Sequence, residues 1–395
     1  EFRRVLFRSS AEAILNIDMI NSWSNINSMP AFITATCEFS RFDDPKRTAA
    51  GELVLLNSNG GGICLFTTVR LAFALDNEVI NGDLLKYMFT PINGEMPRVG
   101  DIQRLAKIEN PGNRNVTLLG DPSIRLAYPT LKVITEEVLQ DGVVGDTLKA
   151  LSKITIKGKV VDQNNNLQTG FNGVVYTTIY DKQSMIYNLV NDATGNDISL
   201  SDSFSLRKNI LYKGKSSVTN GEFVCNFIVP KDINYQFGIG RLSYYAHDNL
   251  TDGNGYDEGI IIGGLSTIGI NDQEGPIINL FMNDENFTIG GMTNENPTIY
   301  AKLSDSSGIN TVGNGIGHDI TAILDNNQQS VLVLNDYYES ELNSYQKGKV
   351  SYKLSDLSEG SHTLTLKAWD INGNSSDRKS TRLNSSHSSV SRMPS

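Results

Sequence analysis

One cysteine follows a run of residues that is suited to a buried β strand. The residues from Ala31 to Thr36 carry no charge and end at Cys37, and a polar turn then continues to Pro45. Such a run is typical of a central parallel strand that is covered on both faces. Ligands and chemistry in open α/β sheets gather beyond the carboxyl ends of the strands, so we interpret Cys37 as a nucleophile. The alternative is a structural thiol, because free cysteine is among the most buried residue types.

A cysteine nucleophile needs a neighbouring base, which is usually a histidine. The chain has four histidines, His247, His318, His362 and His387, and all of them follow residue 246. His318 comes after a glycine-rich turn, where we expect it to bond to the backbone or to Asp319. The part of the chain that contains Cys37 therefore offers a nucleophile and no histidine.

The other two cysteines, Cys64 and Cys225, lie within apolar runs that we predict to be strand interiors. The odd count and the wide spacing argue against a zinc site and against a disulfide framework. We expect both thiols to be structural.

Further polar residues are candidates for binding. Glu38, Arg41, Asp43 and Asp44 follow the nucleophile and are candidates for the substrate cleft. The alternative is that Arg41, Asp43 and Asp44 pair with one another on the surface. We predict no firm metal site and no cofactor. Calcium is possible in one acidic, glycine-rich loop, although its register does not match an EF-hand and a solvated loop is the favoured interpretation. The calcium candidates in that loop are Asp248, Asp252, Asn254 and Asp257.

The first third of the chain alternates helix and strand signals, which predicts an α/β fold with a mainly parallel sheet over residues 10–135. The expected strands are 31–36, 63–68 and 116–119, and the expected helices are 18–23, 48–56, 78–89 and 101–109. Asp18 is the expected cap of the first helix.

Helical periodicity ends near residue 150, and short alternating runs separated by Asn, Asp and Gly follow. This pattern predicts two all-β, immunoglobulin-like sandwiches, over residues 136–270 and 271–377. Both ends of the chain, residues 1–9 and 378–395, are basic and aperiodic. They resemble translated adapter sequence, so we exclude them from the fold.

The formal net charge is −10, and the basic ends make the interior more acidic still. An acidic body argues against nucleic acid as a partner. No apolar run is long enough to predict a membrane-spanning helix.

Several motifs in order resemble the gingipain-type cysteine peptidases, and within them a sortase of the type IX secretion system. The resemblance covers most of residues 11–376. It is carried by the motifs around Cys37, by Leu65-Phe-Thr-Thr-Val-Arg70, by Leu118-Leu-Gly-Asp-Pro-Ser123 and by Gly315-Ile-Gly-His-Asp-Ile320.

The resemblance implies a caspase-like α/β domain, present here as its C-terminal portion, with Cys37 as the nucleophile. It places the catalytic histidine in a Gly-His-Gly motif upstream of residue 10, so we expect this fragment to be inactive. The implied function is the removal of C-terminal secretion signals from cargo and the transfer of cargo to surface lipopolysaccharide. The implied partners are secreted cargo and other secretion components at the outer membrane, and the implied location is the cell surface. The alternative is a non-catalytic surface protein whose β domains bind a partner.

Overall fold

The computed structural model describes residues 15–34, 36–110, 115–187, 203–269, 272–312 and 317–385. The chain divides into two compact units, Glu1–Tyr128 and Pro129–Ser395. The unit boundary precedes the predicted one, because strand β4 (Leu131–Gln140) runs through residue 135 and pairs within the second unit. The predicted terminal segment 1–9 lies outside the described residues.

The first unit contains a small sheet of three described strands in the order β1 (Ala31–Ile33), β2 (Cys64–Thr68) and β3 (Val116–Gly120). β1 and β2 are parallel, with Ala31 opposite Cys64, but β3 is antiparallel to β2. The prediction of a mainly parallel sheet is therefore wrong for β3. The prediction that residues 31–36 form the central strand is also wrong, because β2 holds that position among the described strands and is buried along its whole length.

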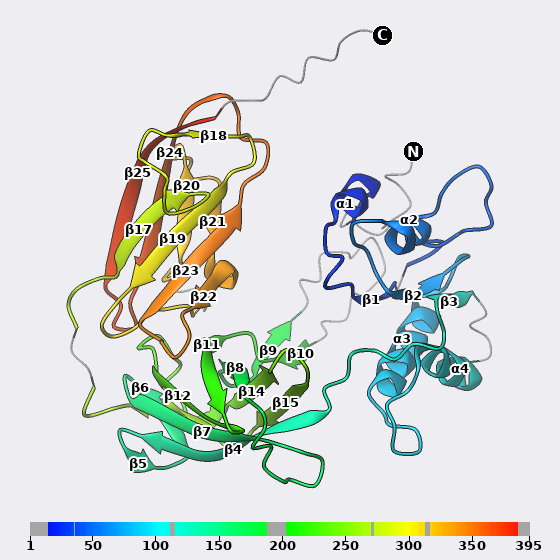
Figure 1. Cartoon of the computed structure of the whole chain (residues 1–395), viewed down its shortest axis with the longest axis horizontal. Helices are drawn as coiled ribbons and strands as arrows, with labels where there is room; N and C mark the ends of the chain where they lie inside the picture. The colour runs from blue at the N-terminus through cyan, green and yellow to red at the C-terminus, as the bar shows by residue number, and fades with distance from the viewer. Residues whose placement is uncertain are drawn as a thin grey trace, which may run out of the picture. The chain divides into compact units, whose positions relative to one another are not determined.

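Helices cover both faces of this sheet (Figure 1). Apolar residues of α3 (Ala74–Met88) and α4 (Val99–Glu109) pack with Phe66 on one face. Residues of α1 (Ile17–Ser22) and α2 (Ala50–Leu56) pack with Leu65 on the other. The predicted helices are present, but the cap of α1 is Asn16, whose side chain accepts the Met19 N–H at 2.8 Å. Asp18 instead lies in the first turn, where its charge complements the helix dipole.

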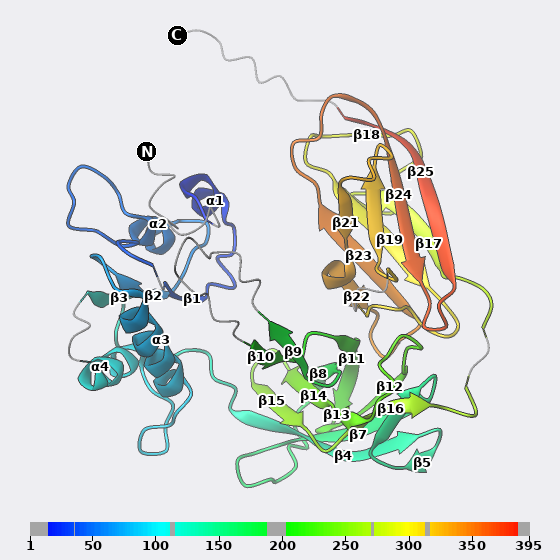
Figure 2. The same cartoon turned by 180° about the vertical axis from the view of Figure 1, so that it is seen from behind.

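The second unit begins with a closed β barrel rather than the predicted sandwich (Figure 2). Seven strands form a hydrogen-bonded ring, which closes when β15 pairs in parallel with β4 at Gly253 and Leu131. Alternation along a strand reports only that one face is buried, so it does not distinguish a barrel from a sandwich. In ring order the strands are β4, β7 (Lys153–Val161), β12 (Glu222–Ile228), β11 (Ile210–Thr219), β8 (Gly173–Tyr180), β14 (Arg241–His247) and β15 (Asp252–Asp257).

Shorter strands accompany the barrel. Strand β5 (Val143–Val144) pairs antiparallel with the end of β4, and β9 (Ser184–Tyr187) pairs with β10 (Ser203–Leu206). A separate small sheet has the order β13 (Gly238–Ile239), β16 (Ile261–Leu265) and β6 (Thr147–Ala150).

The rest of the second unit has two sheets with apolar residues of both in one core, as expected for a β sandwich. The first sheet has the order β17 (Ile277–Met282), β19 (Thr298–Ser304), β23 (Lys347–Lys353) and β22 (Tyr338–Ser340). The second has the order β18 (Met292–Thr293), β25 (Ser375–Ser385), β24 (Gly360–Trp369), β20 (Thr321–Leu324) and β21 (Val331–Val333). A short 3-10 helix, η2 (Asn335–Tyr337), precedes β22.

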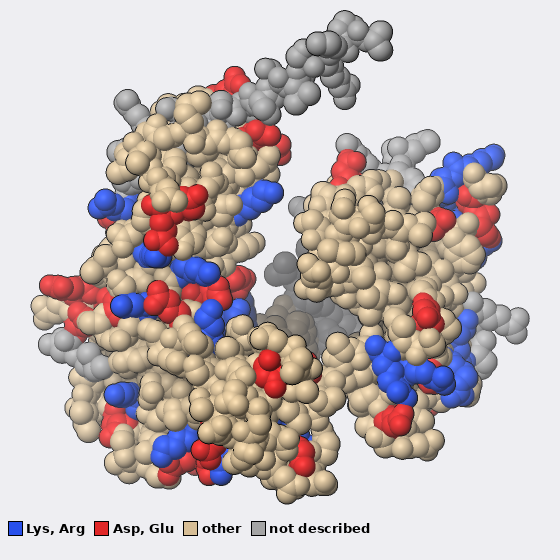
Figure 3. All heavy atoms as spheres, viewed as in Figure 1, with Lys and Arg blue, Asp and Glu red and all other residues tan. Residues whose placement is uncertain are grey.

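Strand β25 corrects the exclusion of the C-terminal segment from the fold. Its residues 378–385 pair with β24 and with β18, and so belong to a sheet. Residues 386–395 lie outside the described part of the chain. None of the described helices is long and apolar enough to cross a membrane. Basic and acidic side chains lie close together on the face shown in Figure 3.

Candidate active site

The turn that carries Cys37 lies at the carboxyl edge of the parallel pair β1 and β2. Strand β1 ends at Ile33, earlier than predicted, and the ladder continues by one bond from the Thr34 N–H to the Phe66 carbonyl at 2.9 Å. Residues 36–40 then form the turn. Cys37 therefore lies beyond the strand end, at the edge where α/β sheets collect their ligands.

The backbone around Cys37 is held in an unusual conformation. Glu38 has a φ of 54°, in the left-handed region, which costs a residue with a side chain about 1–2 kcal/mol. Two backbone bonds to the segment after β2 hold the turn: the Glu38 N–H donates to the Arg70 carbonyl at 3.3 Å, and the Ser40 N–H donates to the Thr68 carbonyl at 3.0 Å. Strain of this kind persists only where neighbouring structure enforces it, and it is concentrated at functional sites.

A small network of hydroxyl groups links the turn to the ends of β1 and β2. The Thr67 hydroxyl bonds to those of Thr34 and Ser40, at 2.8 Å in each case. Gly51 permits this packing, because a Cβ at that position would lie 1.8 Å from the Ser40 oxygen. These residues were not predicted to take part in the site. The available signal was a pair of threonines at the end of the otherwise apolar strand β2, where buried hydroxyls require partners.

The Cys37 thiol is half-buried and contacts the backbone of one residue. Its sulfur lies 3.2 Å from the Ala72 carbonyl oxygen, to which the S–H donates, and it accepts the Ala72 N–H at 3.4 Å. No sequence signal marked Ala72, because Ala72 contributes only its backbone N–H and carbonyl to this contact. The arrangement leaves a partly exposed sulfur at a strand edge, which suits nucleophilic attack better than core packing.

The charged residues after Cys37 form ion pairs. Arg41 bonds to Glu38 at 3.0 Å, and Arg47 lies 3.3 Å from Asp44. Asp43 forms a two-point ion pair with Arg70, and this hydrogen bonding lowers the pKa of the Asp43 carboxyl. The partners are therefore Glu38, Arg47 and Arg70, and none of these three pairs joins Arg41, Asp43 and Asp44 to one another as one sequence interpretation expected. The third links the turn to the segment after β2.

Cys225 lies within its strand, as predicted, whereas Cys64 is the first residue of its strand. Cys64 in β2 and Cys225 in β12 are fully buried. Burial raises the pKa of the Cys64 thiol to about 11 and also raises that of Cys225. A buried thiol with a raised pKa forms little thiolate, so neither is a suitable nucleophile.

The described histidines all belong to the second unit. His318 bonds to Asp232 and stacks near Trp369, with 4.1 Å between ring centroids, so the expected bond to the backbone or to Asp319 is replaced by one to a barrel loop. His362 bonds to Asp325 and to the Ser358 carbonyl, each at 2.8 Å. Burial opposes its charged form, but these acceptors outweigh that effect and raise the pKa of His362.

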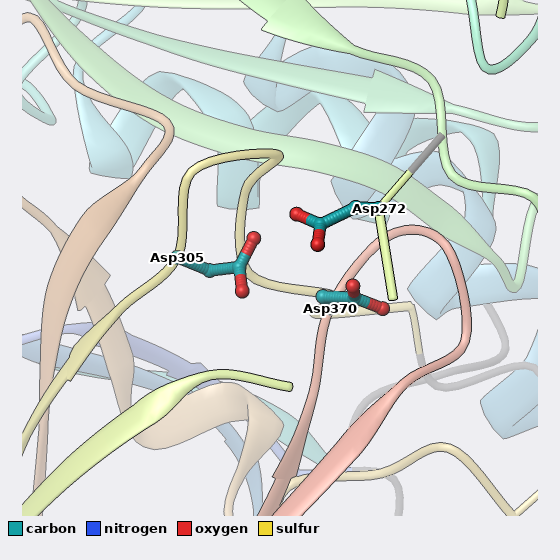
Figure 4. A group of neighbouring side chains, drawn as sticks. All are labelled: Asp272, Asp305 and Asp370. Carbon is teal, nitrogen blue, oxygen red and sulfur yellow. The ribbon is translucent and has the colours of Figure 1, made fainter. Parts of the chain in front are cut away.

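The acidic loop proposed for calcium does not gather its carboxylates. Asp248 accepts the N–H groups of Leu250 and Thr251, and Asp257 accepts that of Gly259. Among the described residues, the carboxylates that do meet are those of Asp272, Asp305 and Asp370, whose oxygens lie within 4.8 Å of one another (Figure 4). Burial and these two neighbouring charges raise the pKa of Asp370.

Comparison with protein families identifies the α/β unit. Residues 6–127 match the model of peptidase family C25. This part of the chain is therefore similar to peptidase family C25. The matched range contains the Cys37 turn and all three strands of the sheet, and the family is one of gingipain-type cysteine peptidases.

Among solved structures, the chain is similar to dimeric latent PorU from Porphyromonas gingivalis, with 30% identity and a TM-score of 0.41. The similarity covers 78% of this chain but only 29% of that one. The complex of RgpB pro- and mature domains from the same organism is 11% identical, with a TM-score of 0.28, and the match covers 62% of this chain and 51% of that one. No curated protein matches the chain.

Proposed function

We propose that Cys37 is the nucleophile of a sortase-like cysteine endopeptidase and transpeptidase. The observation that carries the proposal is the position of the thiol: it lies at the carboxyl edge of β1 and β2, within the range that matches family C25. The proposed reaction removes C-terminal secretion signals from cargo of the type IX system and joins the cargo to surface lipopolysaccharide.

The chemistry follows from the sulfur and its neighbours. A base takes the proton of the Cys37 thiol, and the thiolate attacks the carbonyl carbon of a peptide bond. The protonated base then gives that proton to the leaving amine, and the C–N bond breaks to leave a thioester and a free amine. Water or an amine then attacks the thioester and releases the cysteine. When the thiol loses its proton, its bond to the Ala72 carbonyl is lost, but the bond from the Ala72 N–H remains.

The oxyanion that forms during attack requires a nearby hydrogen-bond donor. We assign one such donor to the backbone N–H of Cys37. The next N–H, that of Glu38, donates to the Arg70 carbonyl and is therefore occupied.

The α/β unit offers no histidine to serve as the base, since none occurs among residues 1–128. We therefore propose that the chain of residues 1–395 is inactive by itself. The proposed location is the cell surface or outer membrane after export, where the partners are secreted cargo and other components of the secretion system.

The proposal is tested on the full-length gene product. A reporter protein that ends in a cargo secretion signal is incubated with the enzyme and an amine acceptor, and both the cleaved and the transferred products are measured by mass spectrometry. Replacement of the nucleophile in Cys37→Ala should reduce both products by about 10³-fold or more. The matched control is Cys64→Ala, which changes a buried thiol of the neighbouring strand and should retain both products.

Two outcomes contradict the proposal. Full activity in full-length Cys37→Ala would rule out the nucleophile. A full-length protein that binds cargo but forms neither product would favour the alternative function, a non-catalytic surface protein. Cleavage without transfer would support the proposed peptidase activity and rule out the proposed transpeptidase activity.

A further inference from the structure

An aromatic cluster lies on the outer surface of the barrel, away from its core. In β14, Tyr244 and Ala246 are buried, whereas Tyr245 is 43% exposed, so alternation places Tyr245 on the outer face. Tyr176 of β8, which is 39% exposed, lies directly opposite Tyr245 in the ladder. His247 follows two residues after Tyr245 and therefore shares the same face.

The three rings form a continuous group. The ring centroids of Tyr176 and His247 are 5.8 Å apart, those of Tyr176 and Tyr245 are 6.3 Å apart, and those of Tyr245 and His247 are 6.0 Å apart. The Tyr245 hydroxyl also lies 3.4 Å from a carboxylate oxygen of Asp252. Contacts of this kind restrain the rings, so a ligand that meets them orders few additional side chains.

An open cavity of about 610 Å³ lies against this group. The turn that joins β14 and β15 forms its rim, and Asp248 holds this turn by accepting the N–H groups of Leu250 at 2.9 Å and of Thr251 at 2.7 Å. Leu250 at the tip is 93% exposed. The volume is in the usual range for small-ligand sites. The lining residues are Tyr176, Tyr245, His247, Asn249, Leu250, Thr251 and Asp252.

The lining residues restrict the chemistry of a ligand. They combine apolar ring surface with amide, hydroxyl, imidazole and carboxylate groups, but they include no lysine or arginine. Phosphate and sulfate groups are bound mainly by such cations, so an anionic ligand is disfavoured next to Asp252. A neutral sugar matches the lining, because its ring has apolar C–H faces and a rim of hydroxyls. Barrel faces with adjoining loops also bind oligosaccharides in an established fold, the OB-fold.

Cross-strand aromatic pairs also stabilise sheets without binding anything. That role accounts for the direct pairing of Tyr176 with Tyr245. It does not account for the cavity or for the exposed Leu250 on its rim. Apolar side chains that only stabilise the fold contribute more free energy when they are buried.

We propose that the cavity formed by Tyr176, Tyr245, His247 and the Asn249–Asp252 turn binds a neutral pyranose unit of a polysaccharide. The two tyrosine rings contact the apolar face of the sugar, and Asn249, Thr251 and Asp252 bond to its hydroxyls. This site is separate from the proposed peptidase chemistry, because none of its residues belongs to the Cys37 turn.

The test uses affinity electrophoresis of the 395-residue chain in gels that contain dextran, yeast mannan, galactan or soluble chitosaccharide, followed by titration calorimetry with the best oligosaccharide. Wild-type protein should be retarded by at least one of these glycans and not by heparin. Tyr176→Ala and Tyr245→Ala should each weaken binding about five- to tenfold. Tyr245→Phe keeps the ring and should bind within about twofold of wild type.

The matched control is Tyr300→Ala. Tyr300 belongs to another outward-facing pair, with Phe281, whose centroids are also 6.3 Å apart, but it lies on the sandwich. This variant should bind the glycan as wild type does. Thermal unfolding followed by circular dichroism establishes that each variant is folded, and a glycan-induced rise in melting temperature that is lost only in the barrel variants supports the site.

Three outcomes overturn the proposal: no binding to any neutral glycan, equal loss of binding in Tyr300→Ala, and binding of tetramethylammonium but not of sugar, which would indicate a cation site. Cys37→Ala should bind the glycan normally. A negative result in the peptidase test therefore does not affect the glycan-binding proposal. A negative result in the glycan-binding test does not affect the proposed peptidase activity.

Discussion

Cys37 and Cys64 lie in the same α/β unit, and their surroundings differ completely. Cys64 is the first residue of β2 and is fully buried, and burial raises the pKa of its thiol to about 11. Cys37 lies beyond the end of the neighbouring strand, half-buried in a turn, with backbone groups of Ala72 as partners. The two thiols therefore differ in burial and in position relative to the strand ends, and only Cys37 is a candidate nucleophile.

The largest expected difference between the two sites is in chemical reactivity. We expect iodoacetamide at pH 8 to label Cys37 in the native protein and to leave Cys64 and Cys225 unmodified. A shift of the Cys64 pKa from 9.0 to about 11 lowers its thiolate fraction about 100-fold. Its buried position also keeps the reagent from reaching the sulfur. Peptide mapping by mass spectrometry at successive times gives the three rates. If native Cys64 is labelled as fast as Cys37, the expected difference in reactivity between the two thiols is wrong. As a control, all three cysteines should be labelled in urea.

A smaller difference is expected in stability. Cys64→Ser places a hydroxyl in the apolar core around Phe66 and should lower the free energy of unfolding by about 1–3 kcal/mol. Cys37→Ser changes a half-exposed turn residue and should cost less than about 0.5 kcal/mol. Urea unfolding of the two variants, followed by circular dichroism, measures both values. An equal cost at the two positions would show that the Cys37 turn is packed like the core.

The smallest expected effect concerns the ion pair that links the turn to the segment after β2. Hydrogen bonding to Arg70 lowers the pKa of Asp43, so the pair stabilises the fold above the ordinary Asp pKa of 3.8 and is lost as the pH falls through the lower folded value. Arg70→Gln should therefore melt slightly below wild type at pH 7, and the difference should shrink as the pH falls below the ordinary Asp value of 3.8. Because the pair is exposed, the expected shift in melting temperature is small. A difference that grows as the pH falls would contradict this assignment.

The success of the sequence predictions depended on the range of the interactions involved. The apolar run 63–68 and the helices near 50–56 and 99–109 were predictable, because burial pattern and local propensity agree there. The end of β1 was not, since Thr34 and Thr36 are of a strand-forming type but the strand ends at Ile33. The outcome for the candidate site was similar. Cys37 was singled out from its own surroundings, whereas its contact with Ala72 and the hydroxyls of Thr67 and Ser40 join segments 27 to 35 residues apart.

The sequence by itself determined which cysteine is the nucleophile candidate, the order of the α/β and all-β regions, and the resemblance of the first unit to a known family. These properties depend on residue type, spacing and motif order, which are local. Only the tertiary structure decided that β3 is antiparallel, that the first all-β region closes into a barrel, and that Tyr176 and Tyr245 share a cavity. Barrel closure requires β4 and β15 to pair although about 120 residues separate them. Alternation along one strand records which face is buried and carries no information about the partner strand.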